Sequence, residues 1–286
     1  MQKHSSGGSD FVSVTTQTPG STKPDPILIA DHITRTFGGL TAVNVAHLEV
    51  QRGSITALIG PNGAGKTTFF NLLTGYDSPN SGTWSFNGKA LNGIASHKVA
   101  RLGMVRTFQL TKALYRLTVL ENMALGARGQ KGESVLTSLF PWVWKAQERE
   151  IQQKAISILT NFKLIDKKDD FAAALSGGQR KLLEMARALM VEPEMVMLDE
   201  PMAGVNPALK QSLLEHIKEL RNQGKTVLFV EHDMDMVHEI SDWVIVMSQG
   251  EIIAEGTPTS VMKNEQVIEA YLGAHHDLDL SAEGDK

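Results

Sequence analysis

Short apolar runs separated by polar residues begin the patterned part of the chain. Three of them lie at Ile27–Ala30, Ile33–Phe37 and Val43–Val50, and a fourth covers Thr83–Asn87. Runs of about four to eight apolar and β-branched residues bounded by polar turns are typical of strands. The pattern therefore predicts an antiparallel β layer near the N-terminus.

Apolar strands and amphipathic helices alternate from residue 175 onward. The helices and buried strands expected in this region are Lys181–Met190, Met195–Leu198, Pro207–Arg221 and Thr226–Val230. Such alternation is typical of a parallel sheet whose strands are joined by helices. Two further apolar runs, Trp243–Met247 and Glu251–Ala254, are joined by Ser-Gln-Gly and are expected to form a hairpin.

The middle of the chain, residues 94 to 162, has a mostly helical pattern that is interrupted at Met104–Thr107. Gly126–Ser134 is glycine-rich and polar, which indicates a loop. Trp142 and Trp144 follow it closely. They are expected either to pack beneath a surface helix or to form part of a partner-docking patch.

The composition of the chain limits the classes of protein to which it can belong. The chain has 286 residues, 42% of them apolar, a net charge of -4 and no cysteine. These values fit a globular protein, argue against one that coats nucleic acid, and exclude disulfides. No apolar run approaches the ~18 residues that span a bilayer, so any membrane role is expected to come through a partner. Residues 1–26 are expected to form a mobile tail, and 275–286 a loose C-terminal one.

The stretch Gly60–Thr67 follows a buried strand, Ile55–Ile59, and precedes an apolar helical pattern, Phe69–Leu73. It matches G-x-x-x-x-G-K-[ST] in the strand–loop–helix setting that this motif requires. Glycines let backbone amides converge on an anion at the start of the helix. Lys66 is predicted to reach the β- and γ-phosphates, and the Thr67 hydroxyl to bind Mg²⁺.

Two carboxylates, Asp199 and Glu200, end the apolar strand that begins at Met195. Ligands of parallel sheets bind at the carboxyl ends of strands. We therefore predict that Asp199 holds Mg²⁺ and that Glu200 polarises an attacking water.

A second candidate anion site lies at Leu175–Gln179, where a serine N-cap and two glycines open a helix. Two anion sites in one chain suggest a nucleotide held between two copies. His232 follows the strand Thr226–Val230 and is expected near the γ-phosphate by the same strand-end rule.

In order and spacing, these motifs resemble those of an ATP-binding subunit of an ABC transporter over roughly residues 28 to 273. The resemblance implies an α/β fold: a P-loop NTPase core with a parallel sheet, an N-terminal antiparallel β layer and a helical subdomain at about 108–178, within an ATPase domain at 27–274. It implies ATP and Mg²⁺ as ligands. It also implies catalytic roles for Glu200, His232 and Gln109, and metal binding by Thr67, Gln109 and Asp199. The nucleotide-binding residues it implies are Phe37, Gly60, Pro61, Asn62, Gly63, Ala64, Gly65, Lys66, Thr67, Thr68, Ser176, Gly177, Gly178 and Gln179.

Four shorter sequence motifs resemble those of the branched-chain amino acid importers, and in particular the longer of the two ATPase forms in that branch. They are Phe37–Leu40, Arg106–Gln109, Leu120–Asn122 and Ala203–Pro207. The resemblance implies two membrane permeases, a sister ATPase or a second copy, indirect coupling to a periplasmic binding protein, and a place on the cytoplasmic face of the inner membrane. Nucleic acid is not an expected partner. Asn206 stands where the family usually has Asp, which puts cross-dimer signalling by that residue in doubt.

The sequence is also compatible with other functional classes of ABC ATPase. Relatives of this branch carry urea or short amides, and an exporter ATPase or a soluble ABC ATPase shares the same motifs. Soluble members usually have two cassettes or a long coiled-coil insertion, and this chain has one cassette and no heptad run.

Overall fold

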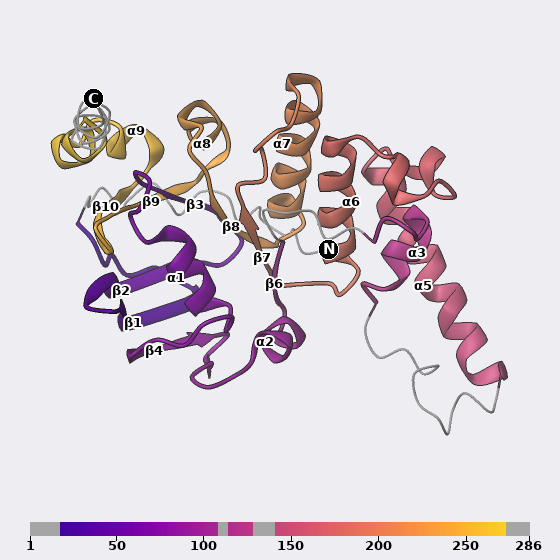
Figure 1. Ribbon diagram of the computed structural model, residues 1–286, viewed down its shortest axis with the longest axis horizontal. Helices are drawn as coiled ribbons and strands as arrows, with labels where there is room; N and C mark the ends of the chain where they lie inside the picture. Colours follow the sequence, from indigo (N-terminus) through magenta and orange to yellow (C-terminus); the bar gives the residue numbers. More distant parts are fainter. Residues whose placement is uncertain (1–17, 108–113, 128–140, 273–286) are drawn as a thin grey trace, which may run out of the picture. The chain divides into compact units, whose positions relative to one another are not determined.

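The computed structural model describes residues 18–107, 114–127 and 141–272. Its contacts divide the chain into two compact units. Unit 1 comprises Met1–Gly93 and His232–Lys286, and unit 2 comprises Ile94–Glu231. Figure 1 labels the helices and strands. Both units combine strands with helices, which confirms the predicted α/β fold class.

Unit 1 contains an antiparallel sheet in the order β2-β1-β4-β5. Its strands are β1 (Pro26–Phe37), β2 (Leu40–Gln51), β4 (Ser81–Phe86) and β5 (Lys89–Ala90). The first two apolar runs, predicted as separate strands, belong to the single strand β1. His32 adopts a φ of 51°, and the β1–β4 register shifts between Asp31 and Thr34. The polar interruption is therefore a bulge inside one strand.

Unit 1 also contains the three strands β10, β9 and β3 of a second sheet. The strand β3 (Ile55–Ile59) is buried throughout and pairs in parallel with β9 (Trp243–Ser248), as expected for a strand covered on both faces. The strand β10 (Glu251–Gly256) pairs antiparallel with β9, so the predicted hairpin is confirmed. The helices of unit 1 are α1 (Lys66–Leu73), α8 (Met234–Ile240) and α9 (Pro258–Val261), and residues 265–272 are also helical.

Unit 2 contains three parallel strands in the order β8-β7-β6. They are β6 (Met104–Arg106), β7 (Met195–Asp199) and β8 (Thr226–Val230), and β7 and β8 are buried at every position. The helices α2 (Ser96–Leu102) and α7 (Pro207–Asn222) accompany them. The Asn206 side chain accepts a hydrogen bond from the Leu209 N–H, which caps α7 as the sequence predicts.

The rest of unit 2 is helical. Helices α3 (Val119–Ala124), α5 (Pro141–Asn161) and α6 (Gly177–Leu189) pack on one another, and two 3₁₀ turns, Ile165–Lys167 and Ala172–Ala174, lie between α5 and α6. Thr118 and Glu121 form a capping box that starts α3. Trp142 and Trp144 belong to α5, but their side chains lie outside the described part.

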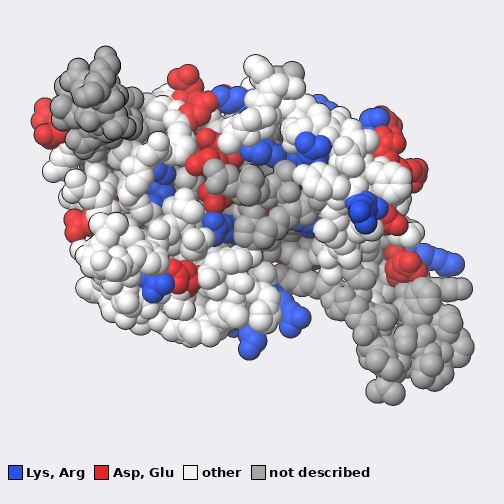
Figure 2. Space-filling view, in the orientation of Figure 1, with Lys and Arg blue, Asp and Glu red and all other residues white. Residues whose placement is uncertain are grey.

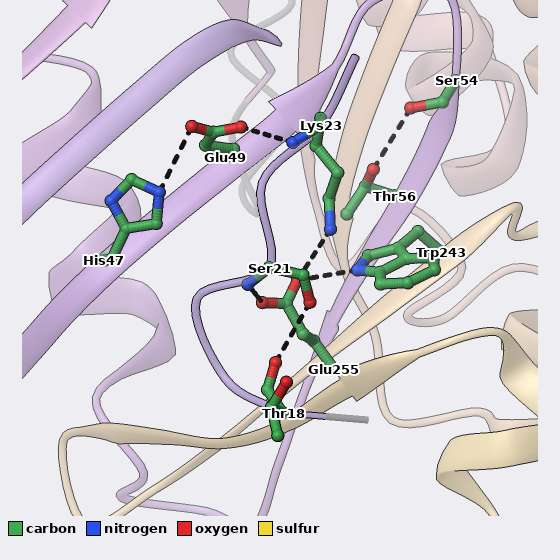
Figure 3. A network of polar contacts seen from close by, with 9 residues as sticks. All are labelled: Thr18, Ser21, Lys23, His47, Glu49, Ser54, Thr56, Trp243 and Glu255. Atoms are coloured by element: carbon green, nitrogen blue, oxygen red, sulfur yellow. Dashed lines mark hydrogen bonds and ion pairs between the residues drawn. The ribbon is translucent and has the colours of Figure 1, made fainter. Parts of the chain in front are cut away.

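The segment before β1 packs on unit 1, although composition assigned residues 1–26 to a mobile tail. Its backbone N–H groups donate to buried carboxylates, Ser21 to Glu255 at 2.6 Å and Lys23 to Glu49 at 2.5 Å. The Lys23 ammonium lies 3.1 Å from Glu255 and 3.9 Å from the ring centroid of Trp243 (Figure 3). Residues 18–25 are therefore held by ionic contacts with strands far along the chain, and the predicted tail residues 1–17 lie outside the described residues.

Acidic and basic side chains are interspersed on the face that Figure 2 displays. None of the described helices combines the length and apolar character needed to cross a bilayer.

Candidate nucleotide-binding and catalytic site

The glycines of the loop after β3 are required by close backbone approaches. A Cβ on Gly60 would lie 2.0 Å from the carbonyl oxygen of Met247, and one on Gly65 would lie 2.3 Å from that of Ala42. Both glycines have a positive φ, 148° and 94°. Only glycine fits where two backbones meet this closely.

The ammonium of Lys66 is buried among loop carbonyls. Its Nζ donates to the carbonyl oxygen of Gly60 at 2.7 Å and to that of Pro61 at 2.8 Å. Thr67 is exposed at the start of α1, and Asn62 and Gly63 are exposed at the tip of the loop. The loop thus presents its tip and the first turn of α1 to solvent, with the lysine charge directly beneath.

The turn between β9 and β10 supports this loop, which sequence reasoning did not foresee. The Gly250 N–H donates to the Ala64 carbonyl at 3.1 Å, and the Gly250 carbonyl accepts from the Asn44 N–H at 2.7 Å. Gly250 therefore links the loop to strand β2 through its N–H and its carbonyl. Its sequence signal, Ser-Gln-Gly, indicates a turn but not what the turn contacts.

Phe37, the expected adenine contact, ends β1 with 47% of its surface exposed. The guanidinium of Arg35 lies 4.6 Å from the Phe37 ring centroid and makes a two-pronged contact with Asp77, at 3.0 and 2.8 Å. Arg35 thus lies against the ring and is itself bound by Asp77, and neither residue was among the predicted ones.

In unit 2, Asp199 ends β7 and is 5% exposed. The Arg106 side chain, at the end of the neighbouring strand β6, donates to it at 2.6 Å. Arg106 was noted in the sequence as part of the motif Arg106–Gln109, but its contact with Asp199 was not predicted. Asp199 thus lies at the carboxyl end of β7, the edge at which ligands bind in parallel sheets.

Glu200 follows with a φ of 47°, an unusual left-handed conformation for a non-glycine residue. Its N–H donates to the Val230 carbonyl at 3.0 Å. The Met202 N–H donates to the buried Glu231 carboxylate at 2.8 Å. Lys181 contacts this segment from α6. Beside these groups lies a cavity of about 20 Å³, which is room for roughly one water molecule.

The Leu175–Gln179 stretch opens α6 as predicted. Ser176 and Gln179 form a capping box in which the Gln179 N–H donates to Ser176 Oγ at 3.2 Å and the Ser176 N–H to Gln179 Oε1 at 2.9 Å. A Cβ on Gly178 would lie 2.6 Å from Leu209 of α7, so this glycine permits close packing of two helices. Ser176 and Gly177 are exposed at the positive end of the helix.

The remaining predicted site residues are distributed between the units. His232 is exposed directly after Glu231. Gln109 lies outside the described residues. The structure brings Asp199 together with Arg106, and it joins α6 to the Glu200 segment within unit 2. The expected meeting of the Gly60–Thr67 loop with Asp199 stays a prediction.

A phosphate-type glycine loop after a buried parallel strand, together with a strand that ends in carboxylates, defines a P-loop nucleotide-hydrolysing protein. The profile of the family described as "ABC transporter" matches residues 43–203, and that of "Branched-chain amino acid ATP-binding cassette transporter" matches residues 251–277. The chain therefore belongs to the ATP-binding cassette family of transporter ATPases.

Individual relatives agree with the family. The chain is 44% identical over 248 residues to the probable branched-chain amino acid transport ATP-binding protein LivG of Archaeoglobus fulgidus, covering 87% of this chain and 96% of the relative. It is 41% identical to the high-affinity branched-chain amino acid transport ATP-binding protein BraF of Pseudomonas aeruginosa, covering 87% and 98%. The crystal structure of the ADP conformation of MJ1267, an ATP-binding cassette of an ABC transporter, matches with a TM-score of 0.74 and 38% identity, covering 87% and 99%. The predicted family and ATPase class are confirmed.

Proposed function

We propose that this chain powers the import of branched-chain or other neutral amino acids as the longer ATPase subunit of an ABC importer. The observation that carries this proposal is the match of residues 251–277 to the branched-chain type, in addition to the general cassette match. The alternative is a related importer for urea or short amides. The permease and the binding protein select the solute, so the second candidate shares every residue of the site.

Nucleotide binding follows from the chemistry of unit 1. The amides of the loop and the first turn of α1 bind the phosphates of ATP. Lys66 transfers its hydrogen bonds from the neutral carbonyls of Gly60 and Pro61 to phosphate oxygens, because charge-assisted bonds are stronger. Adenine stacks on the exposed ring of Phe37.

Mg²⁺ suits the proposed ligand set, since the hydroxyl of Thr67, the carboxylate of Asp199 and the amide oxygen of Gln109 are hard oxygen donors. No group of three His, Cys, Asp or Glu side chains suited to a metal occurs in the described part. A nucleotide-bound Mg²⁺ does not need one, because phosphates supply several of its ligands. When bound, the ion neutralises charge on the phosphate oxygens.

Hydrolysis is assigned to Glu200 and His232, together with Gln109, which contacts Mg²⁺ and the attacking water. The Glu200 carboxylate accepts a proton from the attacking water, and a His232 imidazole N–H stabilises charge on the γ-phosphate. Ser176 and Gly178 contact the nucleotide held by the opposite subunit, so two cassettes enclose each ATP. The opposite subunit is a shorter sister ATPase or a second copy, and Asn206 supplies hydrogen bonding without charge at the subunit boundary.

The two permeases dock on the helical region at about 110 to 150, on the cytoplasmic face of the inner membrane. Within this region Tyr115 and Leu125 expose 50% and 56% of their surface, and Phe171, which is 58% exposed, forms a β-bridge with Thr118 of the region. Apolar side chains exposed to this degree favour a protein contact. Cysteines introduced at 115 and 125, in a cysteine-free chain, are expected to cross-link to a permease, and cross-links arising only from 240–270 would contradict this placement.

The function itself is tested with purified protein and with the assembled transporter. Lys66→Ala is expected to lose ATP hydrolysis, and Glu200→Gln to form an ATP-dependent dimer that turns over slowly. In vesicles that contain both permeases, ATP-dependent uptake of leucine is compared with that of urea. Uptake of urea alone would replace the amino acid assignment with its alternative, and full ATPase activity in Lys66→Ala would remove the proposed site.

A further inference from the structure

Lys181 lies in the second turn of α6 and reaches the segment that carries Glu200. Its Nζ donates to the carbonyl oxygens of Glu200 at 3.1 Å and Pro201 at 3.3 Å, and makes a closer contact with the Ala203 carbonyl. An ammonium has three N–H donors, and here each has a carbonyl acceptor. The Lys181 side chain thus contacts three backbone carbonyls within residues 200–203.

This segment requires external support. Glu200 has a φ of 47°, and a non-glycine residue in a sparsely populated backbone region costs about 1–3 kcal/mol. Two contacts come from the end of β8 and the residue after it, where the Val230 carbonyl accepts the Glu200 N–H and the Glu231 carboxylate accepts the Met202 N–H. Lys181 supplies the contact from α6 to the carbonyls of the segment, and the Glu200 carbonyl also accepts the Ala203 N–H at 3.2 Å. The position of the Glu200 side chain therefore depends on where α6 lies.

Neighbouring carboxylates offset part of the cost of burying the Lys181 ammonium. Burial lowers the pKa of Lys181 below its usual 10.5, and the carboxylates of Glu231, Glu184 and Glu200 oppose that shift. The side chain also borders the cavity of about 20 Å³ together with Asp199 and Glu200. A cation at this point balances carboxylates and holds the carbonyls with charge-assisted bonds.

We propose that Lys181 is a positioning residue that couples the signature end of α6 to the general base, Glu200. The helix begins at the Ser176 cap, which under the proposed function contacts the nucleotide of the opposite subunit. A displacement of α6 on closing around that nucleotide moves Lys181, and Lys181 moves the backbone that carries Glu200. Hydrolysis at one site thereby becomes sensitive to occupancy of the other, an inference that rests on the proposed function.

Steady-state ATPase kinetics of the full-length chain test this coupling. Lys181→Met keeps the length of the stem and removes the donors. We expect kcat to fall roughly ten- to hundredfold, as for a misplaced catalytic group, while the ATP dissociation constant changes less than about threefold. Lys181→Arg keeps a cationic donor and is expected to recover most of the turnover. Lys154→Met is the matched control, because Lys154 lies in the same unit and forms an ion pair with the exposed carboxylate of Glu192.

The outcomes separate three cases. A fall in kcat for Lys181→Met at unchanged ATP affinity, with recovery in Lys181→Arg, supports the coupling. Normal turnover per folded molecule, with a lowered melting temperature, makes Lys181 a purely structural residue and overturns the inference alone. Failure of the proposed function is seen separately, as equal activity of the wild type and Lys66→Ala.

Discussion

The Arg106 guanidinium donates to the Asp199 carboxylate at 2.6 Å, and the two side chains are only 6% and 4% exposed. A buried pair that loses one partner leaves an uncompensated charge, which costs about 3–5 kcal/mol. We expect Arg106→Met to lower the melting temperature strongly. Since the bare carboxylate attracts a cation more, Mg-ATP should raise the melting temperature of the variant more than that of the wild type. Thermal unfolding with and without Mg-ATP measures both effects.

The control for this variant is Lys167→Met, because Lys167 forms a solvent-exposed pair with Asp170 at 3.0 Å in the same unit. An exposed pair contributes about 0–1 kcal/mol, so this change should be nearly silent. Equal melting temperatures for Arg106→Met and the wild type would mean that Asp199 does not depend on Arg106.

The loop glycines give a second prediction. In Gly65→Ala the new methyl group meets the Ala42 carbonyl oxygen at 2.3 Å, a backbone atom that cannot rotate away. We expect ATP affinity to fall more than about hundredfold, or about 2.8 kcal/mol. Gly63→Ala is the matched control, because its φ is also positive, 79°, but no atom lies within 4 Å of the added Cβ. The penalty expected for Gly63→Ala is the backbone strain of about 1–2 kcal/mol. Its ATP affinity should therefore fall less than that of Gly65→Ala. Fluorescent-nucleotide titration compares them, and similar affinities would contradict the close approach.

The ionic contact of the N-terminal segment gives a third prediction. The Lys23 ammonium and the Glu255 carboxylate are 3% and 1% exposed, so Lys23→Met leaves a buried carboxylate without its cation. The expected loss is about 3–5 kcal/mol in the free energy of unfolding. Adding Glu255→Gln removes the stranded charge and should restore part of the loss. Urea unfolding measures this cycle, with exposed Lys89→Met as control. An unchanged midpoint in Lys23→Met would mean that residues 18–25 do not stabilise unit 1.

The fourth prediction concerns pH. The His216 ring stacks on Phe162 with centroids 4.2 Å apart. Burial, and then the positive charge of Lys163, lower the pKa of His216 below its usual 6.5, against the opposing carboxylates of Glu215 and Glu219. The unfolded chain therefore binds the proton more readily than the folded chain. This contribution to stability is complete above about pH 6.5 and is lost as the pH falls below it.

His216→Phe keeps an aromatic ring but cannot be protonated. Its urea midpoint should fall less between about pH 7.5 and about pH 5.5 than that of the wild type, because one proton-linked term is absent. His97→Gln, at an exposed position of α2, should keep the wild-type pH dependence. If His216→Phe follows the wild-type curve, another group carries the acid sensitivity.

The last prediction concerns His232, which is exposed after β8. His232→Ala should slow hydrolysis strongly while ATP affinity stays within roughly a factor of ten, about 1.4 kcal/mol, because the imidazole acts mainly in the transition state. Turnover, ATP affinity and melting temperature are measured on one preparation. Near-normal turnover in a well-folded variant would exclude the residue from the mechanism.

The local parts of this protein could be predicted from sequence because their signals are contiguous. The buried run Ile55–Ile59, the glycine loop after it and the helix from Lys66 form one short segment whose pattern specifies strand, turn and helix. The serine N-cap of α6 was predicted for the same reason, and the structure adds the reciprocal bond from the Ser176 N–H to the Gln179 side chain. The strands β7 and β8 follow from apolar runs bounded by polar residues.

Only the tertiary structure decided which distant groups meet. The Lys23 and Glu255 side chains are 232 positions apart, and Arg106 and Asp199 are 93 apart. A lone cation among Ser, Thr and Pro residues gives no sign of its partner, so composition assigned residues 18–25 to a tail. The contact between Lys181 and the carbonyls of residues 200–203 is invisible for the same reason, since any residue type supplies a backbone carbonyl. Local backbone preferences determine the motifs that lie within one segment. The contacts of Lys23, Arg106 and Lys181 instead depend on the tertiary packing that brings separate segments together.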